Sequence, residues 1–274
     1  MDDGKGPSKI LFKTDKGEEM SEIKKLEDVI SALRGENGCP WDKKQTPQTL
    51  KNYLLEEVYE LIEAIEEDDE EALKEELGDV LFMLVFLAHI YRQRGKFSLQ
   101  DVIDQEVAKM VGRHPHVFGE FRPKSIEEIH ARWEEIKGKE KPKRRSLLDG
   151  IPKTLPALML AYKVGKKAAK VGFDWKRPED VFEKLEEETE EFKQSLKQQN
   201  AEKIKEELGD ILFCWVNVAR LLKIQPEDAL RQTVKKFKKR FQFIENELKK
   251  RQRDIKEASL EEMDALWEVA KGKS

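Results

Sequence analysis

The sequence predicts an all-α protein made by tandem duplication of one helical domain of four or five helices. Three observations indicate this. The hexapeptide KEELGD occurs at residues 74–79 and again at 205–210. The composition is rich in Glu, Lys and Leu, with only 10 prolines and 15 glycines among 274 residues, which favours helices. Apolar residues around both copies recur at helical spacing, and alternation of apolar and polar residues is nearly absent.

Further blocks of sequence recur in the same order on either side of the hexapeptide. Residues 56–79 align without a gap on 187–210, CPWDKKQTP matches VGFDWKRPE, and SIEEIHARWEEIKGK matches SLEEMDALWEVAKGK. Repetition of this kind indicates that one supersecondary unit has been copied. We therefore expect a flexible arm at 1–20, a first domain at 21–139, a basic linker at 140–152 and a second domain at 153–274.

The helices of the first half can be placed in order. A first helix spans about 21–35 and ends in the turn NGCPWD. The second begins at Thr46, a good N-cap, with Pro47 at its first position. The third, EALKEELGDVLFMLVFLAHIYRQRG, becomes more apolar towards its end, as expected for a helix in a bundle core. Two more helices begin at Ser98 and Ser125.

Composition excludes several classes of protein. Charged residues make up 39% of the chain with a net charge of −4, so a general nucleic-acid binder, which needs a basic surplus, is not expected. Cys39 and Cys214 form no disulfide framework and fit a reducing compartment. The N-terminal segment has no apolar signal region, and no apolar run approaches the span of a bilayer. We expect a soluble, cytoplasmic protein without membrane or nucleic-acid partners.

Acidic residues around KEELGD predict a metal site. Glu57 and Glu60 lie roughly 60° apart on one helix face, and Glu76 and Asp79 do the same on the next helix. If the two helices pair antiparallel, four carboxylates converge and repel one another. A hard divalent cation bound by oxygen ligands, Mg²⁺ or alternatively Mn²⁺, would relieve that repulsion. The glycine at position 78 would then let the neighbouring helix or a phosphate approach closely.

Two other interpretations of these residues exist. Runs of helical glutamates are commonly solvated faces, but an identical spacing in both halves argues against that. A di-iron site needs two ExxH motifs, and this chain has one, from Glu127 to His130, whose counterpart in the second half is Asp264. The histidines of RHPHVF are expected to have a structural or phosphate-side role.

The motifs EExxE, ELGD and KxxxR, with CPWDKKQT, GRHPHVFG and VGFDW, resemble those of the MazG family of nucleoside triphosphate pyrophosphohydrolases. The resemblance implies an all-α fold, a homodimer, Mg²⁺ dependence, and conversion of a nucleoside triphosphate to the monophosphate and pyrophosphate, as in nucleotide-pool house-cleaning. It also implies the metal ligands of both halves, which are Glu57, Glu60, Glu76 and Asp79, then Glu188, Glu191, Glu207 and Asp210. The nucleotide positions are Lys236 and Arg240 for the triphosphate, with Lys184, Lys203 and Trp267.

Several residues beside these positions have two interpretations. Glu56 and Glu187 are candidates for positioning or deprotonating water, or else partners of the ligands. Trp133 and Trp267 could stack on a base or lie in the core. Lys109 and Arg113 are the counterparts of Lys236 and Arg240.

The second half is expected to be the more complete nucleotide site. It has basic and amide side chains where the first half has none: Lys184, Lys203, Asn217 and Arg220 align with Tyr53, Ala72, Phe86 and His89. Two rival functions remain. One is a narrower pyrophosphatase for dUTP or dCTP, and the other is a helical interaction module whose metal sites have decayed. We further expect the halves to pack pseudo-symmetrically and the chains to dimerise through like faces.

Overall fold

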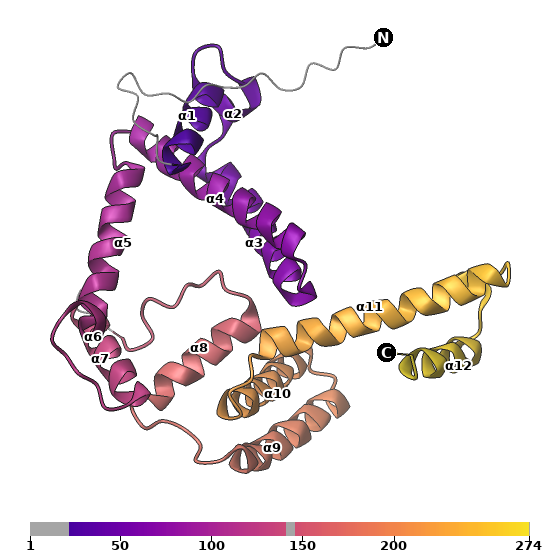
Figure 1. Cartoon of the computed structure of the whole chain (residues 1–274). Helices are drawn as coiled ribbons and strands as arrows, with labels where there is room; N and C mark the ends of the chain where they lie inside the picture. The colour runs from indigo at the N-terminus through magenta and orange to yellow at the C-terminus, as the bar shows by residue number, and fades with distance from the viewer. Residues whose placement is uncertain (1–21, 141–145, 274) are drawn as a thin grey trace, which may run out of the picture. The chain divides into compact units, whose positions relative to one another are not determined.

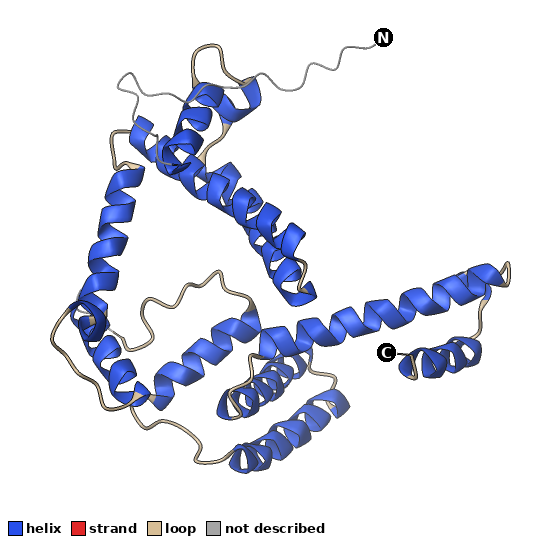
Figure 2. Ribbon diagram, in the orientation of Figure 1, coloured by secondary structure: helices blue, strands red, loops and turns tan. Residues whose placement is uncertain are grey.

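The computed structural model describes residues 22–140 and 146–273, in which every regular element is a helix (Figures 1 and 2). The predicted all-α fold is therefore confirmed. The predicted arm at 1–20 and the basic start of the linker at 141–145 lie outside the described residues. The chain divides into two compact units, unit 1 (Met1–Lys141) and unit 2 (Pro142–Ser274). The bounds of the linker itself stay a prediction.

Unit 1 is organised around one long helical hairpin. Helices α3 and α4 pack along each other and are joined by only two residues, Asp68 and Asp69. Helix α1 packs on α4, and α7 packs on α5. The elements of this unit are α1 (Glu22–Arg34), α2 (Pro40–Lys44), α3 (Pro47–Glu67), α4 (Glu70–Gln93), α5 (Leu99–Arg113), α6 (Pro115–Phe118) and α7 (Ile126–Lys139). The short helices α2 and α6 both begin at proline, and α2 lies where a turn was expected.

The predicted helix starts are confirmed by their capping hydrogen bonds. The Thr46 hydroxyl accepts from the Thr49 backbone N–H at 3.2 Å, and the Thr49 hydroxyl accepts from the Thr46 N–H at 3.0 Å. Such a reciprocal cap satisfies two backbone donors that the helix leaves unpaired. Ser98 forms the same kind of box with Asp101, and Ser125 accepts from the backbone of the first turn of α7.

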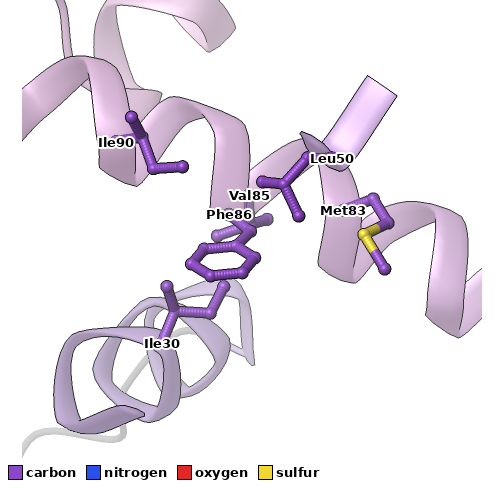
Figure 3. Close-up of a cluster of buried hydrophobic side chains, with 6 residues drawn as sticks. All are labelled: Ile30, Leu50, Met83, Val85, Phe86 and Ile90. Atoms are coloured by element: carbon purple, nitrogen blue, oxygen red, sulfur yellow. The ribbon is translucent and has the colours of Figure 1, made fainter. Parts of the chain in front are cut away.

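The core of unit 1 lies between α1, α3 and α4. Figure 3 shows its six buried side chains, which come from one residue of α1, one of α3 and four of α4. The apolar end of α4 is therefore buried, as its sequence indicated. This core holds one end of the hairpin, and the carboxylates lie nearer the other end, towards the connection between α3 and α4. The six residues are Ile30, Leu50, Met83, Val85, Phe86 and Ile90.

Unit 2 repeats the hairpin with α9 and α10, against which α8 packs as α1 does in unit 1. A buried cluster of Val181, Cys214 and Val218 joins α9 to α10. Helix α12 folds back onto α11 around Ile244, Leu248 and Leu266. The elements are α8 (Ala157–Ala169), α9 (Pro178–Lys197), α10 (Ala201–Leu221), α11 (Pro226–Lys250), the single 3₁₀ turn η1 (Ile255–Glu257) and α12 (Leu260–Lys271).

A buried arginine fixes the turn before the hairpin in unit 2. Arg220 of α10 donates to both carboxylate oxygens of Asp174 in the VGFDW turn, and its Nε donates to the Asn217 side-chain oxygen at 3.1 Å. Helix α8 can pass over this network because position 165 is glycine. A Cβ there would lie 2.8 Å from the Asn217 oxygen and 2.9 Å from Arg220 Nε.

Unit 1 fixes the equivalent turn with an arginine from a different helix. Arg34 of α1 donates to the backbone carbonyls of Asp42 and Gln45, at 2.5 and 3.2 Å. Its guanidinium carbon lies 5.4 Å from the centroid of the Phe86 ring, which occupies the place of Asn217. Each copy thus holds this turn with an arginine, which comes from α1 in unit 1 and from α10 in unit 2.

None of the described helices is both long enough and apolar enough to cross a lipid bilayer.

Two glycine substitutions in unit 2 should have opposite effects on stability. Gly165→Ala places a methyl group against Asn217 and Arg220, and such overpacking costs about 1–3 kcal/mol of unfolding free energy. Gly209→Ala, in the interior of α10, meets no atom within 4 Å and should stabilise the helix by up to about 1 kcal/mol. Thermal unfolding of the two variants checks this. Equal shifts in Tm, or a loss of stability in Gly209→Ala, would contradict the packing described for α8 and α10.

Candidate functional site

Each hairpin brings three carboxylates together from two helices. In unit 1 the oxygens of Glu57, Glu76 and Asp79 lie within 4.8 Å of one another. Glu57 comes from α3, and the other two lie three residues apart on one face of α4. The two-residue connection makes the helices antiparallel, so these faces meet. The structure thereby brings together three of the four side chains predicted as ligands in this unit.

Unit 2 repeats this arrangement with Glu188 of α9 and with Glu207 and Asp210 of α10, again within 4.8 Å. We call each group a carboxylate triad. The fourth predicted ligands, Glu60 and Glu191, are exposed and lie outside the triads. Their charges still act on the triads. In addition to burial, the charge of Glu60 raises the pKa of Glu57 and Glu76, and the charge of Glu191 raises the pKa of Glu207.

Like charges at close range shape the electrostatics of both triads. Burial raises the pKa of Glu57, and the charges of Asp79, Glu60 and Glu76 raise it further. Burial likewise raises the pKa of Glu207, and the charges of Glu191 and Glu188 raise it further. The pKa of Asp210 is raised first by burial and then by Glu188. The folded chain therefore holds carboxylates in places where their charge is unfavourable without a compensating cation.

The side chains that are present fit a hard divalent cation. Every donor in both triads is a carboxylate oxygen, the ligand type that Mg²⁺ and Mn²⁺ prefer. In unit 1 the Oε2 atom of Glu76 is buried and has no hydrogen-bond partner among the described residues. Buried polar atoms without a partner are uncommon, and a metal ion is one explanation for them. In unit 2, Glu188 is only 6% exposed although it is ionisable.

A lysine neutralises part of the triad in unit 2. Lys184 lies one turn before Glu188 on α9, and its Nζ donates to Glu188 at 2.7 Å and to Glu187 at 2.8 Å. These two hydrogen bonds raise the pKa of Lys184. Glu187, a predicted catalytic residue, is exposed and is joined to the edge of the triad through Lys184. In unit 1, Glu56 is likewise exposed beside Glu57, and the roles of both residues stay predictions.

The predicted triphosphate contacts of unit 2 lie on the α11–α12 hairpin. The guanidinium carbon of Arg240 lies 5.6 Å from the centroid of the Trp267 ring, and Lys236 is exposed on the same helix. The Arg240 Nε atom is buried and has no hydrogen-bond partner among the described residues. A cavity of about 250 Å³ opens beside it, with Lys273 on its rim. Trp267 is half-buried and packs on the α11–α12 core, and its stacking on a base stays a prediction.

In unit 1 the equivalent arginine, Arg113 of α5, is already paired with a carboxylate. Arg113 lies over Trp133, with 5.4 Å from the guanidinium carbon to the ring centroid, but it also donates to both carboxylate oxygens of Glu140. Lys109 is paired with Glu106. Sequence reasoning did not single out Glu140. Its signal is an alignment difference, because the residue that aligns with it in the second half is Ser274.

Other predicted nucleotide positions are used by the fold. Asn217 is 1% exposed, and both Asn217 and Arg220 belong to the network under α8. Lys203 is exposed in the first turn of α10. Nucleotide contacts by these residues stay a prediction.

The expectation that glycine lets the neighbouring helix approach is wrong. A Cβ at Gly78 or at Gly209 would meet no atom within 4 Å among the described residues. Each glycine faces open space, and the approach of a phosphate stays a prediction.

Together these features define a class of all-helical repeat proteins in which each of two hairpins has a carboxylate group that could hold a metal ion. Comparison with known families places it more closely. The model of the MazG nucleotide pyrophosphohydrolase domain matches twice, at residues 45–118 and 176–243. The chain belongs to the MazG family.

Individual relatives match along most of the chain. It is 45% identical over 251 residues to the nucleoside triphosphate pyrophosphohydrolase/pyrophosphatase MazG of Thermotoga maritima, covering 91% of this chain and 96% of the relative. It is 40% identical to the nucleoside triphosphate pyrophosphohydrolase of Escherichia coli, covering 92% and 98%. It is 50% identical to the uncharacterized protein YabN of Bacillus subtilis, covering 91% of this chain and 52% of that protein.

The raised pKa values predict how stability depends on pH in the absence of metal. The folded-state pKa of Glu207 lies above its ordinary value of 4.5, so the folded chain binds more protons than the unfolded chain between the two pKa values. Stability from this group is present at acidic pH and is lost as pH rises through the folded-state pKa. Glu207→Gln should therefore raise the Tm of the metal-free chain near neutral pH, and the gain should shrink on acidification. Thermal unfolding across pH measures this.

Glu186→Gln, on α9 outside the triad, is the control for loss of one negative charge. If it raised the Tm as much as Glu207→Gln did, the effect would come from net charge rather than from repulsion within the triad.

Proposed function

We propose that this chain hydrolyses nucleoside triphosphates to the monophosphate and pyrophosphate, with Mg²⁺ held at the carboxylate triads and Mn²⁺ as an alternative. The observation that carries the proposal is the triad itself: three carboxylate oxygens lie within 4.8 Å in each hairpin, and burial and nearby negative charges raise the pKa of two of them, Glu57 and Glu76 in unit 1 and Glu207 and Asp210 in unit 2. Relatives at 40–45% identity bear the name of this activity. A role in the cytoplasm, in clearing or regulating the nucleotide pool, is part of the proposal.

The residues of unit 2 divide the chemistry between them. Glu188, Glu207 and Asp210 would hold the cation, which when bound supplies Lewis acidity at phosphate oxygens and lowers the pKa of a water molecule. Glu187, exposed at the edge of the triad, accepts hydrogen bonds and can orient a water for attack on the α-phosphate. Lys184, already within hydrogen-bond distance of the triad, can move to the phosphate oxygens when substrate enters.

The departing pyrophosphate needs its own cationic contacts. Lys236 and Arg240 lie one turn apart on α11, and the unpartnered Nε of Arg240 is a donor suited to a phosphate oxygen. The carboxylates belong to α9 and α10, whereas Arg240 and Trp267 belong to the hairpin of α11 and α12. Productive binding requires both groups to meet at one triphosphate.

A homodimer is part of this proposal. The hairpins expose an apolar stripe at aligned positions, and each stripe repeats at helical spacing on the second helix of its hairpin. Contiguous exposed apolar side chains of this kind mark interaction surfaces. We expect a second copy of the chain to cover them. The side chains are Leu77, Leu81 and Leu84 on α4, and Leu208, Leu212 and Trp215 on α10.

The two triads should contribute unequally to turnover. Glu188→Gln removes one ligand from the triad that has Lys184 beside it, and turnover should fall by about a hundredfold or more, because even outer partners of metal ligands are worth 10–100-fold. Glu57→Gln, the aligned change in unit 1, should retain most activity, and the double variant should be nearly inactive. Pyrophosphate release from each of the common NTPs and dNTPs in Mg²⁺ measures this.

The same substrate panel separates a broad enzyme from one that prefers dUTP or dCTP. Circular dichroism controls for folding of the variants. Turnover like that of the wild type in the double variant, at ordinary Mg²⁺ concentration, would sink the assignment of the triads.

A further inference from the structure

Unit 1 has an aromatic pair beside its carboxylate triad, where unit 2 has a lysine. Tyr53 aligns with Lys184 and lies one turn before Glu57 on α3, so it is on the same side of the helix as the triad. The ring of Trp41, from α2, packs against Tyr53 edge-on, with centroids 5.7 Å apart and an angle of 63° between the rings.

Both aromatic side chains are open to solvent. Trp41 is 51% exposed and Tyr53 is 36% exposed. Neither the indole N–H nor the phenol O–H has a hydrogen bond within the described residues. In an edge-on pair only one ring face is covered by its partner, so a planar group can still stack on the pair.

The exposure of Trp41 does not come from a loose segment, because the turn that carries it is tied down. Arg34 donates to the carbonyls of Asp42 and Gln45, and the Gln45 side chain donates to the Trp41 carbonyl at 3.3 Å. The Thr49 hydroxyl donates to the Gln45 side-chain oxygen at 2.7 Å, which joins the turn to α3. An aromatic ring held rigidly in solvent is preorganised for a ligand.

At two aligned positions, unit 1 lacks the lysines that unit 2 offers to a long phosphate chain. Ala72 stands where Lys203 stands in unit 2, and Tyr53 replaces Lys184. The guanidinium of Arg113 is engaged by both oxygens of the Glu140 carboxylate. Hydrogen bonds to phosphate from charged donors are among the stronger polar contacts, so their loss selects against a triphosphate.

We infer that Trp41 and Tyr53 form a nucleobase-stacking site, through which unit 1 binds a nucleoside monophosphate. The base stacks on the aromatic pair, and the single phosphate lies towards the triad of Glu57, Glu76 and Asp79, where a divalent cation offsets the negative charge. The cation at this triad rests on the proposed function. The ligand belongs to the same chemical class as the product of the proposed reaction, so unit 1 senses product rather than turning over substrate.

Equilibrium dialysis of AMP, GMP, CMP and UMP, each with Mg²⁺, tests this on the full-length chain carrying Glu188→Gln, which disables the triad of unit 2. At least one monophosphate should bind saturably, and its nucleoside and inorganic phosphate should bind far more weakly. Adding Trp41→Ala should weaken binding by about tenfold or more, as expected for loss of a base–aromatic stack. Trp41→Phe, which keeps a ring, should retain most of the affinity.

Phe173→Ala is the matched control, because Phe173 aligns with Trp41 in unit 2 and is exposed. It should leave binding unchanged. The inference is overturned if no monophosphate binds, if Trp41→Ala and Phe173→Ala have the same effect, or if a non-hydrolysable triphosphate binds unit 1 more tightly than any monophosphate. Turnover of the wild-type chain separates the two proposals: turnover without monophosphate binding defeats this inference alone, and absence of turnover on any triphosphate defeats the proposed function.

Discussion

Repulsion between carboxylates in a helical hairpin is the constraint on which the rest of this structure depends. Three acidic side chains from two antiparallel helices lie within 4.8 Å in each unit, and the pKa values of two of them are raised by burial and by neighbouring negative charges. The fold tolerates this because an apolar core at the far end of the hairpin, such as the one around Phe86 and Leu50, holds the helices together. The stability of the core is what permits an unfavourable arrangement of charge at the site.

The two copies have kept the triads and changed what surrounds them. The arginine that ties the turn before the hairpin comes from α1 in unit 1 and from α10 in unit 2, with Gly165 making room for it there. The Nε atom of Arg240 on α11 has no hydrogen-bond partner among the described residues, whereas the aligned Arg113 on α5 donates to Glu140. The two copies thus share the charge requirement and differ in the cations around it, and this difference is the basis for the different ligands proposed for the two units.

Much of this was readable from sequence, because helical periodicity and capping chemistry are local. The starts of α3, α5 and α7 followed from Thr46, Ser98 and Ser125, and the meeting of Glu57 with Glu76 and Asp79 followed from spacing and a short turn. Burial was harder to foresee. Asn217 and Arg220 were placed beside the nucleotide by resemblance, but they form a network under α8, which only the packing of Gly165 reveals. The contact between Arg113 and Glu140 spans 27 residues, and its one sequence signal is that Glu140 aligns with a serine in the second half.

The central claim is that each triad exists to hold a divalent cation. The most direct measurement is a titration of the full-length chain with Mn²⁺ in the absence of nucleotide, followed by electron paramagnetic resonance of the free ion. The account predicts saturable binding at both triads, and Glu57→Gln and Glu188→Gln should each remove one of the two sites. Absence of saturable binding, or a stoichiometry that neither substitution changes, would contradict it.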